Sequence, residues 1–173
     1  MRTGLTVGFD LVSGGVTEAV GWARRWQEGR PDLWLTVPLD AAEVAALEPG
    51  LVTVEVPVAK LPSLGRALAE RGVRVVVAGL GTSAIDLDAL VDVHPAAVKV
   101  SVQRRALGPA VALGLAVCGK VIVTDVDSPE LLADARNVGA TAVQGAQLSA
   151  PLTGIDAVLA HLAEEETALA SRG

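Results

Sequence analysis

Residues 120–127, KVIVTDVD, decide the fold, because they predict a buried strand that leads directly into a capped helix. The apolar run 121–123 is typical of a short strand covered on both faces. Ser128 follows as an N-cap, and Pro129 stands at the first helical position, where its missing N–H is not needed. Residues 120–137 therefore predict one strand–helix unit.

The same alternation of strand and helix fills the rest of the chain. Short connections between such units favour a parallel sheet, either closed as a barrel or left open. No linker or change of composition divides the sequence, so residues 1–173 are expected to form a single domain. Strands are predicted at 5–12, 33–37, 51–56, 73–77, 97–100, 120–123 and 141–144, and helices at 17–28, 41–47, 62–71, 86–91, 106–117, 129–137 and 153–166. Pro109 and Gly114 weaken the prediction of the helix at 106–117.

The composition excludes several classes of function. Of the 173 residues, 51% are hydrophobic and only 2% aromatic, and the net charge is −6. Such a chain lacks both the basic surface and the stacking platform of a nucleic-acid-binding protein. Cys118 is the single cysteine, so neither a disulfide framework nor a thiolate metal cluster is expected. The N-terminus does not resemble a signal peptide, and the most apolar run, 111–118, is too short to span a bilayer, so we expect a cytoplasmic protein.

Several stretches, in the same order along the chain, resemble the motifs of the bacterial EAL-domain family, which hydrolyses cyclic di-GMP. Residues 120–127 align without a gap with the family's KVIAEGVE. Further likeness lies at 75–82 (LALDDFGT), 98–101 (LKID), 138–145 (LG…VQG) and 149–152 (SRPL), and weaker likeness at 54–57 (LEITE), 35–39 (LSVNLS) and 9–12 (VEAL). The resemblance implies a TIM-like barrel with one antiparallel strand followed by seven parallel ones. Only seven units are counted here, so the family's first strand is expected to be missing and the barrel to be incomplete or closed by oligomerisation.

The resemblance also implies a reaction in which two Mg²⁺ or Mn²⁺ ions hold the attacking water at the carboxyl ends of the strands. Two such ions need several carboxylate ligands. Glu55 is the acidic residue that matches the family pattern, and Asp10 is a shorter substitute at the signature position. The family's paired aspartates are replaced by Ala78 and Gly79. Pro38, Ser101, Thr124 and Asp127 also depart from the pattern, whereas Lys99 and Gln144 match it. We therefore expect no phosphodiesterase activity, no catalytic residues, no bound metal and no other cofactor.

The strand ends still offer ligand-binding candidates, each of which also has a structural interpretation. Glu55 and Lys99 form either a remnant binding site or a buried ion pair that satisfies both charges. Gly79-Leu80-Gly81 is either a tight turn or a weak phosphate cradle. The candidates for ligand binding are Asp10, Glu55, Lys99, Ser101, Thr124, Asp127 and Gln144.

Three functions remain open. The first is an inactive EAL-like domain that acts as a protein-interaction and regulatory module in bacterial signalling. We expect it to self-associate as a dimer, because an exposed sheet edge tends to be covered. The second is a receptor that binds cyclic di-GMP without hydrolysing it. The third is an enzyme of unrelated chemistry at the barrel mouth, with Lys99 as acid or base. No nucleic-acid or membrane partner is expected.

Overall fold

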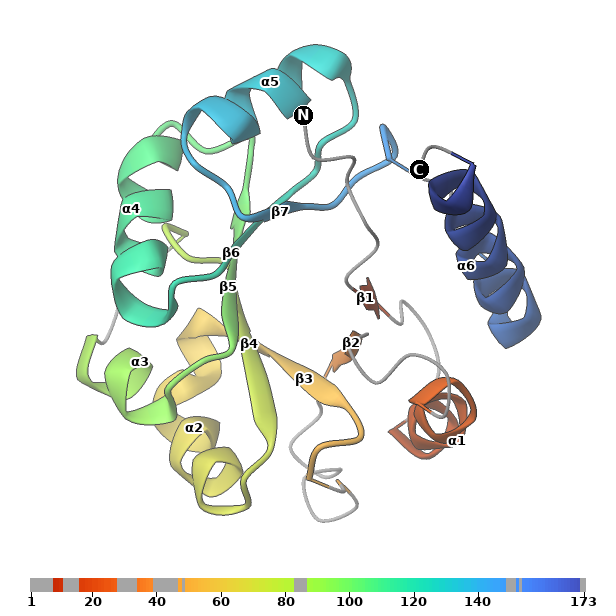
Figure 1. The fold of residues 1–173 in the computed structure, drawn as a ribbon. Coiled ribbons are helices and arrows are strands. Elements are labelled where there is room, and N and C mark those ends of the chain that lie inside the picture. Colours follow the sequence, from red (N-terminus) through yellow and green to blue (C-terminus); the bar gives the residue numbers. More distant parts are fainter. Residues whose placement is uncertain are drawn as a thin grey trace.

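The computed structural model describes residues 8–10, 16–27, 34–38, 47, 49–82, 87–148, 152 and 154–171. Within them seven strands form one sheet in the order β1 to β7, and every neighbouring pair is parallel. The sheet curls into a half-barrel (Figure 1). The strands are β1 (Gly8–Asp10), β2 (Trp34–Pro38), β3 (Thr53–Pro57), β4 (Arg74–Ala78), β5 (Ala97–Ser101), β6 (Val121–Thr124) and β7 (Ala142–Val143).

Helices alternate with the strands, and α2 to α5 lie along the outside of the curved sheet (Figure 1). The predicted parallel α/β architecture, with seven strands and helices alternating with them, is confirmed. Of the predicted elements, the helix at 41–47 falls almost entirely outside the described residues, as do both ends of the strand at 5–12. The helices are α1 (Val16–Gln27), α2 (Leu61–Glu70), α3 (Leu87–Val93), α4 (Leu107–Cys118), α5 (Pro129–Asn137) and α6 (Gly154–Ala170), with a 3-10 turn, η2 (Val58–Lys60), before α2.

The two faces of the sheet differ because side chains alternate along each strand. The outer face, against the helices, is built largely of valines that are at most 2% exposed, including Val54, Val77, Val98 and Val123. The inner face carries polar side chains alongside apolar ones such as Val76. Thr36, Thr53 and Lys99 lie there and are the buried polar residues of the described core. The buried polar side chains of the sheet therefore lie on the inside of the half-barrel.

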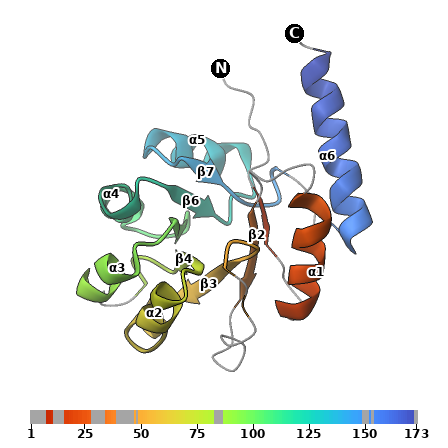
Figure 2. The same cartoon turned by 60° about the horizontal axis from the view of Figure 1, so that its bottom comes forward.

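The final helix packs beside the first strand, although the two are far apart in the sequence. The rings of Phe9 on β1 and His161 on α6 meet edge to face at 6.2 Å. Arg25 on α1 donates a hydrogen bond to Asp156 on α6 at 3.4 Å. Figure 2 shows α1 and α6 side by side. The helical layer thus continues past β7 to cover the outer face of β1.

Helix α4 runs through both residues that weakened its prediction. Pro109 lies in the first turn, where helical N–H groups have no partner within the helix. Gly114 faces the sheet, and a Cβ placed on it would come within 2.4 Å of Val98 Cγ2 and 2.8 Å of Val121 Cγ2. The glycine is therefore required for the close packing of α4 on β5 and β6. Among the described residues, no helix is long and apolar enough to cross a membrane.

Helix α5 begins at the predicted cap, where Ser128 Oγ accepts a hydrogen bond from Leu131 N at 3.3 Å. Ser128→Ala is expected to lower the free energy of unfolding by about 1 kcal/mol. The hydrogen bond from Ser128, together with Glu130's own backbone N–H, holds the pKa of the Glu130 carboxyl below its ordinary value of 4.5. A lowered folded-state pKa stabilises the folded protein above pH 4.5. This contribution is lost as the pH falls below 4.5 and through the folded-state pKa of Glu130. Urea unfolding of both proteins between pH 3 and pH 7 should therefore show a difference that narrows in acid; a constant difference would contradict the role of Glu130.

Candidate functional site

The carboxyl ends of the strands surround a cavity of about 280 Å³ inside the half-barrel. Strand register brings its walls together: Ala78 on β4 pairs with Lys99 on β5, and Ser101 on β5 pairs with Thr124 on β6. The lining residues are Asp10, Glu55, Ala78, Gly79, Thr82, Lys99, Ser101, Arg104, Thr124 and Gln144. Six of the seven ligand-binding candidates named from the sequence are among them, that is, all except Asp127.

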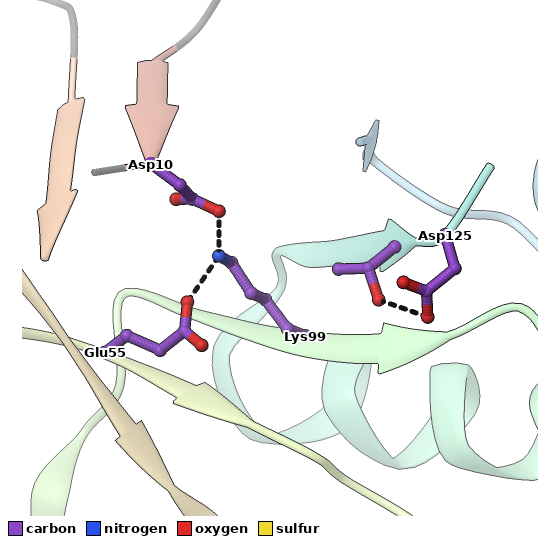
Figure 3. A network of polar contacts seen from close by, with 5 residues as sticks. Asp10, Glu55, Lys99 and Asp125 are labelled. Atoms are coloured by element: carbon purple, nitrogen blue, oxygen red, sulfur yellow. Dashed lines mark hydrogen bonds and ion pairs between the residues drawn. The ribbon is translucent and has the colours of Figure 1, made fainter. Parts of the chain in front are cut away.

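Lys99 lies between two carboxylates in this cavity (Figure 3). Its ammonium Nζ donates hydrogen bonds to Asp10 Oδ2 and, at 2.5 Å, to Glu55 Oε2. The Lys99 side chain is only 6% exposed, whereas Asp10 is 22% and Glu55 30% exposed. The ion pair expected between Glu55 and Lys99 is present, and Asp10 joins it. One buried ammonium therefore links β1, β3 and β5, which are alternate strands of the sheet.

The remaining polar candidates help to shape the loops at the strand ends. Thr124 Oγ1 donates to Asp125 Oδ2 at 3.2 Å, and this pair lies apart from Lys99 (Figure 3). Ser101 Oγ accepts a hydrogen bond from Gln103 N at 3.3 Å. Asp127 Oδ1 accepts one from Ala146 N at 2.9 Å, outside the cavity lining. The first two contacts connect a strand end to the segment that follows it, and the third joins the segments after β6 and β7.

Gly79-Leu80-Gly81 forms a tight turn after β4, which agrees with the structural interpretation of this motif. Leu80 N donates to Lys99 O at 3.2 Å, and Thr82 N donates to Gly79 O at 3.0 Å. Gly79 has a φ of 79°, in the left-handed region that favours glycine. A Cβ on Gly79 would lie 3.2 Å from Thr82 Oγ1. The backbone at this position therefore disfavours any side chain.

Three solved structures have folds similar to this arrangement. The EAL domain of Mycobacterium smegmatis DcpA matches with a TM-score of 0.70 and 18% identity over 85% of this chain and 81% of that one. The PaMucR phosphodiesterase in complex with cyclic di-GMP matches with a TM-score of 0.65 and 20% identity over 78% of this chain and 68% of that one. The FimX EAL domain from Pseudomonas aeruginosa, bound to cyclic di-GMP, matches with a TM-score of 0.63 and 21% identity over 79% of this chain and 69% of that one. The chain has an EAL-like fold. No family model matches the sequence, and no curated protein is significantly similar to it.

The residues at the mouth of this EAL-like fold do not fit a pair of divalent ions. Asp10 and Glu55 are the two carboxylates in the lining, and both already bind Lys99. At the end of β4, where the resemblance places two aspartates, Ala78 and Gly79 have no ligand atoms in their side chains. Among the described residues, no three histidine, cysteine or acidic side chains are grouped to hold a metal ion. Two ions need several carboxylate oxygens to offset four positive charges, and this donor set does not supply them.

Arg104 and Thr82 also line the cavity, although neither is among the ligand-binding candidates named from the sequence. Arg104 lies three residues beyond β5, and its backbone N donates to Ser101 O at 3.2 Å. Its position just after a strand end is the signal that could have identified Arg104, because loops at that end of a barrel surround the site.

Proposed function

We propose that the chain is a non-catalytic EAL-like domain that functions by binding protein, including a second copy of itself. The observation that carries the proposal is the pairing of Lys99 with both Asp10 and Glu55. A protein-borne cation already pairs with the two carboxylates of the mouth that would otherwise be available to a metal ion.

Electrostatics supports the absence of hydrolysis. A divalent ion between Asp10 and Glu55 would meet the Lys99 ammonium within a few Å, and like charges repel strongly where water is partly excluded. Displacing Lys99 would leave its charge in a site where the side chain is 6% exposed, and burying an unpaired charge is costly. The site therefore stabilises the protein without holding the ions that the reaction requires.

The two end strands of the sheet support protein binding. β1 and β7 stand at the two ends of the sheet, and within the described residues they do not pair with each other. Exposed sheet edges in soluble proteins are normally covered or paired. In a dimer with two-fold symmetry, both copies use the same surface, so the edge of one copy is covered by the equivalent edge of the other.

A second candidate is binding of cyclic di-GMP without hydrolysis. It is favoured by the bound nucleotide in the PaMucR and FimX structures and by Arg104 at the mouth. Against it, the cavity of about 280 Å³ lies at the lower limit of ligand pockets, which span roughly 300–1,000 Å³. Its described lining contains no aromatic side chain for guanine stacking, and two carboxylates would face the phosphates. The third hypothesis, an unrelated enzyme, has no comparable observation in its favour among the described residues.

The test is incubation of the purified chain with cyclic di-GMP and Mg²⁺ or Mn²⁺, with chromatographic detection of the linear dinucleotide. PaMucR phosphodiesterase serves as the positive control. We expect no hydrolysis above the rate without protein, and metal-dependent product would refute the proposal. Calorimetry with about 100 µM cyclic di-GMP tests the second candidate, because this concentration reaches the weak end of useful affinity. A heat of binding that disappears in Arg104→Ala would favour the receptor. If the wild-type protein shows no heat of binding, the protein-binding function stands.

A further inference from the structure

Two basic side chains meet one aromatic ring at the amino-terminal end of the half-barrel. Trp34 begins β2, Arg74 begins β4, and Lys120 directly precedes β6. Each stands two residues before a side chain of the inner face, so all three face the inside. Lys120 Nζ lies 3.9 Å and Arg74 Cζ 5.2 Å from the centroid of the Trp34 ring. These three side chains form what we call the amino-end cluster, at the opposite end of the strands from the Lys99 cavity.

The amino-end cluster carries two positive charges and no carboxylate. Within the described residues, neither Arg74 nor Lys120 forms an ion pair. The whole chain has 20 acidic against 14 basic residues, so the cluster is an exception to its overall charge. The face of an aromatic ring attracts a cation but has no net charge, so Trp34 neutralises neither side chain. Two like charges that converge in this way favour an anion between them.

A buried hydroxyl group lies beside the cluster. Thr53 on β3 is 1% exposed, and its Oγ1 has no hydrogen-bond partner among the described residues. Thr53 is the register partner of Arg74 on β4, and partners in a parallel sheet project side by side from the same face. A buried hydroxyl without a partner destabilises a protein. An anion bound to Arg74 would supply the acceptor that this hydroxyl lacks.

We propose that the amino-end cluster binds a phosphate monoester group, in a site separate from the mouth and independent of the protein-binding function proposed above. At neutral pH such a group carries a charge of about −1.5 to −2, which matches the two cations. Its oxygens accept paired hydrogen bonds from the planar guanidinium of Arg74 and single ones from the Lys120 ammonium and the Thr53 hydroxyl. A carboxylate or a phosphodiester carries one charge, so neither balances both cations.

The experiment is a fluorescence titration of the full chain with glycerol phosphate and, in parallel, with a phosphoserine peptide. The Trp34 ring reports on binding because both cations contact it. Trp34→Phe identifies its share of the emission, since Trp22 and Trp26 on α1 also fluoresce. We expect a dissociation constant of about 1 mM. Binding should weaken as NaCl is added, because salt screens exposed charges.

Four variants test the residues of the site. Arg74→Gln and Lys120→Gln are each expected to weaken binding about tenfold, as for the loss of a charge-assisted hydrogen bond. Lys60→Gln is the matched control, because it removes the same charge from an exposed residue that follows β3, at the other end of the strands. Thr53→Val keeps the shape of the side chain but removes the unpartnered hydroxyl. It should therefore raise the Tm and weaken binding, two opposite effects that a structural role alone does not produce.

The alternative is that the two cations only pack on Trp34 and close this end of the sheet. Arg74→Gln would then lower the Tm, and neither ligand would change the wild-type Tm or the Trp34 emission at about ten times the expected dissociation constant. That result overturns the site. Binding that Lys60→Gln weakens as much as Lys120→Gln also overturns it, because the phosphate then responds to net charge alone.

The two ligands distinguish the source of the phosphate. A phosphoserine peptide that binds more tightly than glycerol phosphate, and whose unphosphorylated form does not bind, supports the site with a phosphorylated protein as its ligand. Equal affinity for both supports the site with a small phosphate ester. Equal binding of the phosphorylated and unphosphorylated peptides, without binding of glycerol phosphate, overturns the proposal, because the phosphate group is then not what is recognised.

Discussion

Lys99→Met is expected to lower the free energy of unfolding by about 3 kcal/mol at neutral pH. Methionine keeps the length and apolar stem of lysine but removes the charge. The Asp10 and Glu55 carboxylates then face each other across the mouth without the ammonium that both now bind. The expected loss is at the lower end for broken buried pairs, because the two carboxylates remain 22% and 30% exposed and retain some hydration.

Urea unfolding of three further variants tests the cause of that loss. Asp10→Asn and Glu55→Gln alone should each cost less than Lys99→Met, because one carboxylate still pairs with Lys99. The triple variant should recover part of the loss, because no unpaired charge remains, and such coupling is expected of residues in contact. If the triple variant is as unstable as the sum of its parts, charge pairing does not explain the loss of stability in Lys99→Met.

The alternation of valine-rich strands with helices was sufficient to predict a parallel sheet, and the resemblance to EAL domains added the expectation of an incomplete barrel. In the runs 75–77 and 121–123 the first and third valines are buried on the helical side, and both runs lie in parallel strands of the sheet. Capping signals were local, so Ser128 and Pro129 located the start of α5 to the residue. Gly114 was harder to interpret, because its role depends on Val98 and Val121, which meet α4 only after the sheet has formed.

The site was predicted less completely, since its contacts depend on curvature. Lys99 and Asp10 are 89 residues apart and lie on strands that do not neighbour each other. Only the curl of the sheet brings β1 and β5 within reach across the interior. Strand alternation placed Lys99 and Glu55 at the mouth, but it gave no sign that Asp10 would share the same ammonium. Asp127 was assigned to the mouth by motif position, whereas its carboxylate binds the backbone of Ala146.

Gly145→Ala is expected to lower the free energy of unfolding by about 3 kcal/mol, near the upper end for inserting an atom into a packed site. A Cβ on Gly145 would lie 2.3 Å from Val126 O, 2.4 Å from Val126 N and 2.5 Å from Val126 C. These are backbone atoms and cannot rotate away. Val126 N donates to Gln144 O and Val126 O accepts from Gln147 N, both at 3.1 Å, so moving that segment breaks contacts on both sides of it.

Gly21→Ala is the matched control for the conformational effect of replacing glycine. A Cβ on Gly21, within α1, would meet nothing within 4 Å. Alanine there should raise the free energy of unfolding by up to about 1 kcal/mol, because it is the better helix former. Thermal and urea unfolding of the two variants should therefore shift in opposite directions. A Gly145→Ala protein as stable as the wild type would mean that the segments after β6 and β7 separate easily, and that the mouth of the half-barrel is not held closed at this point.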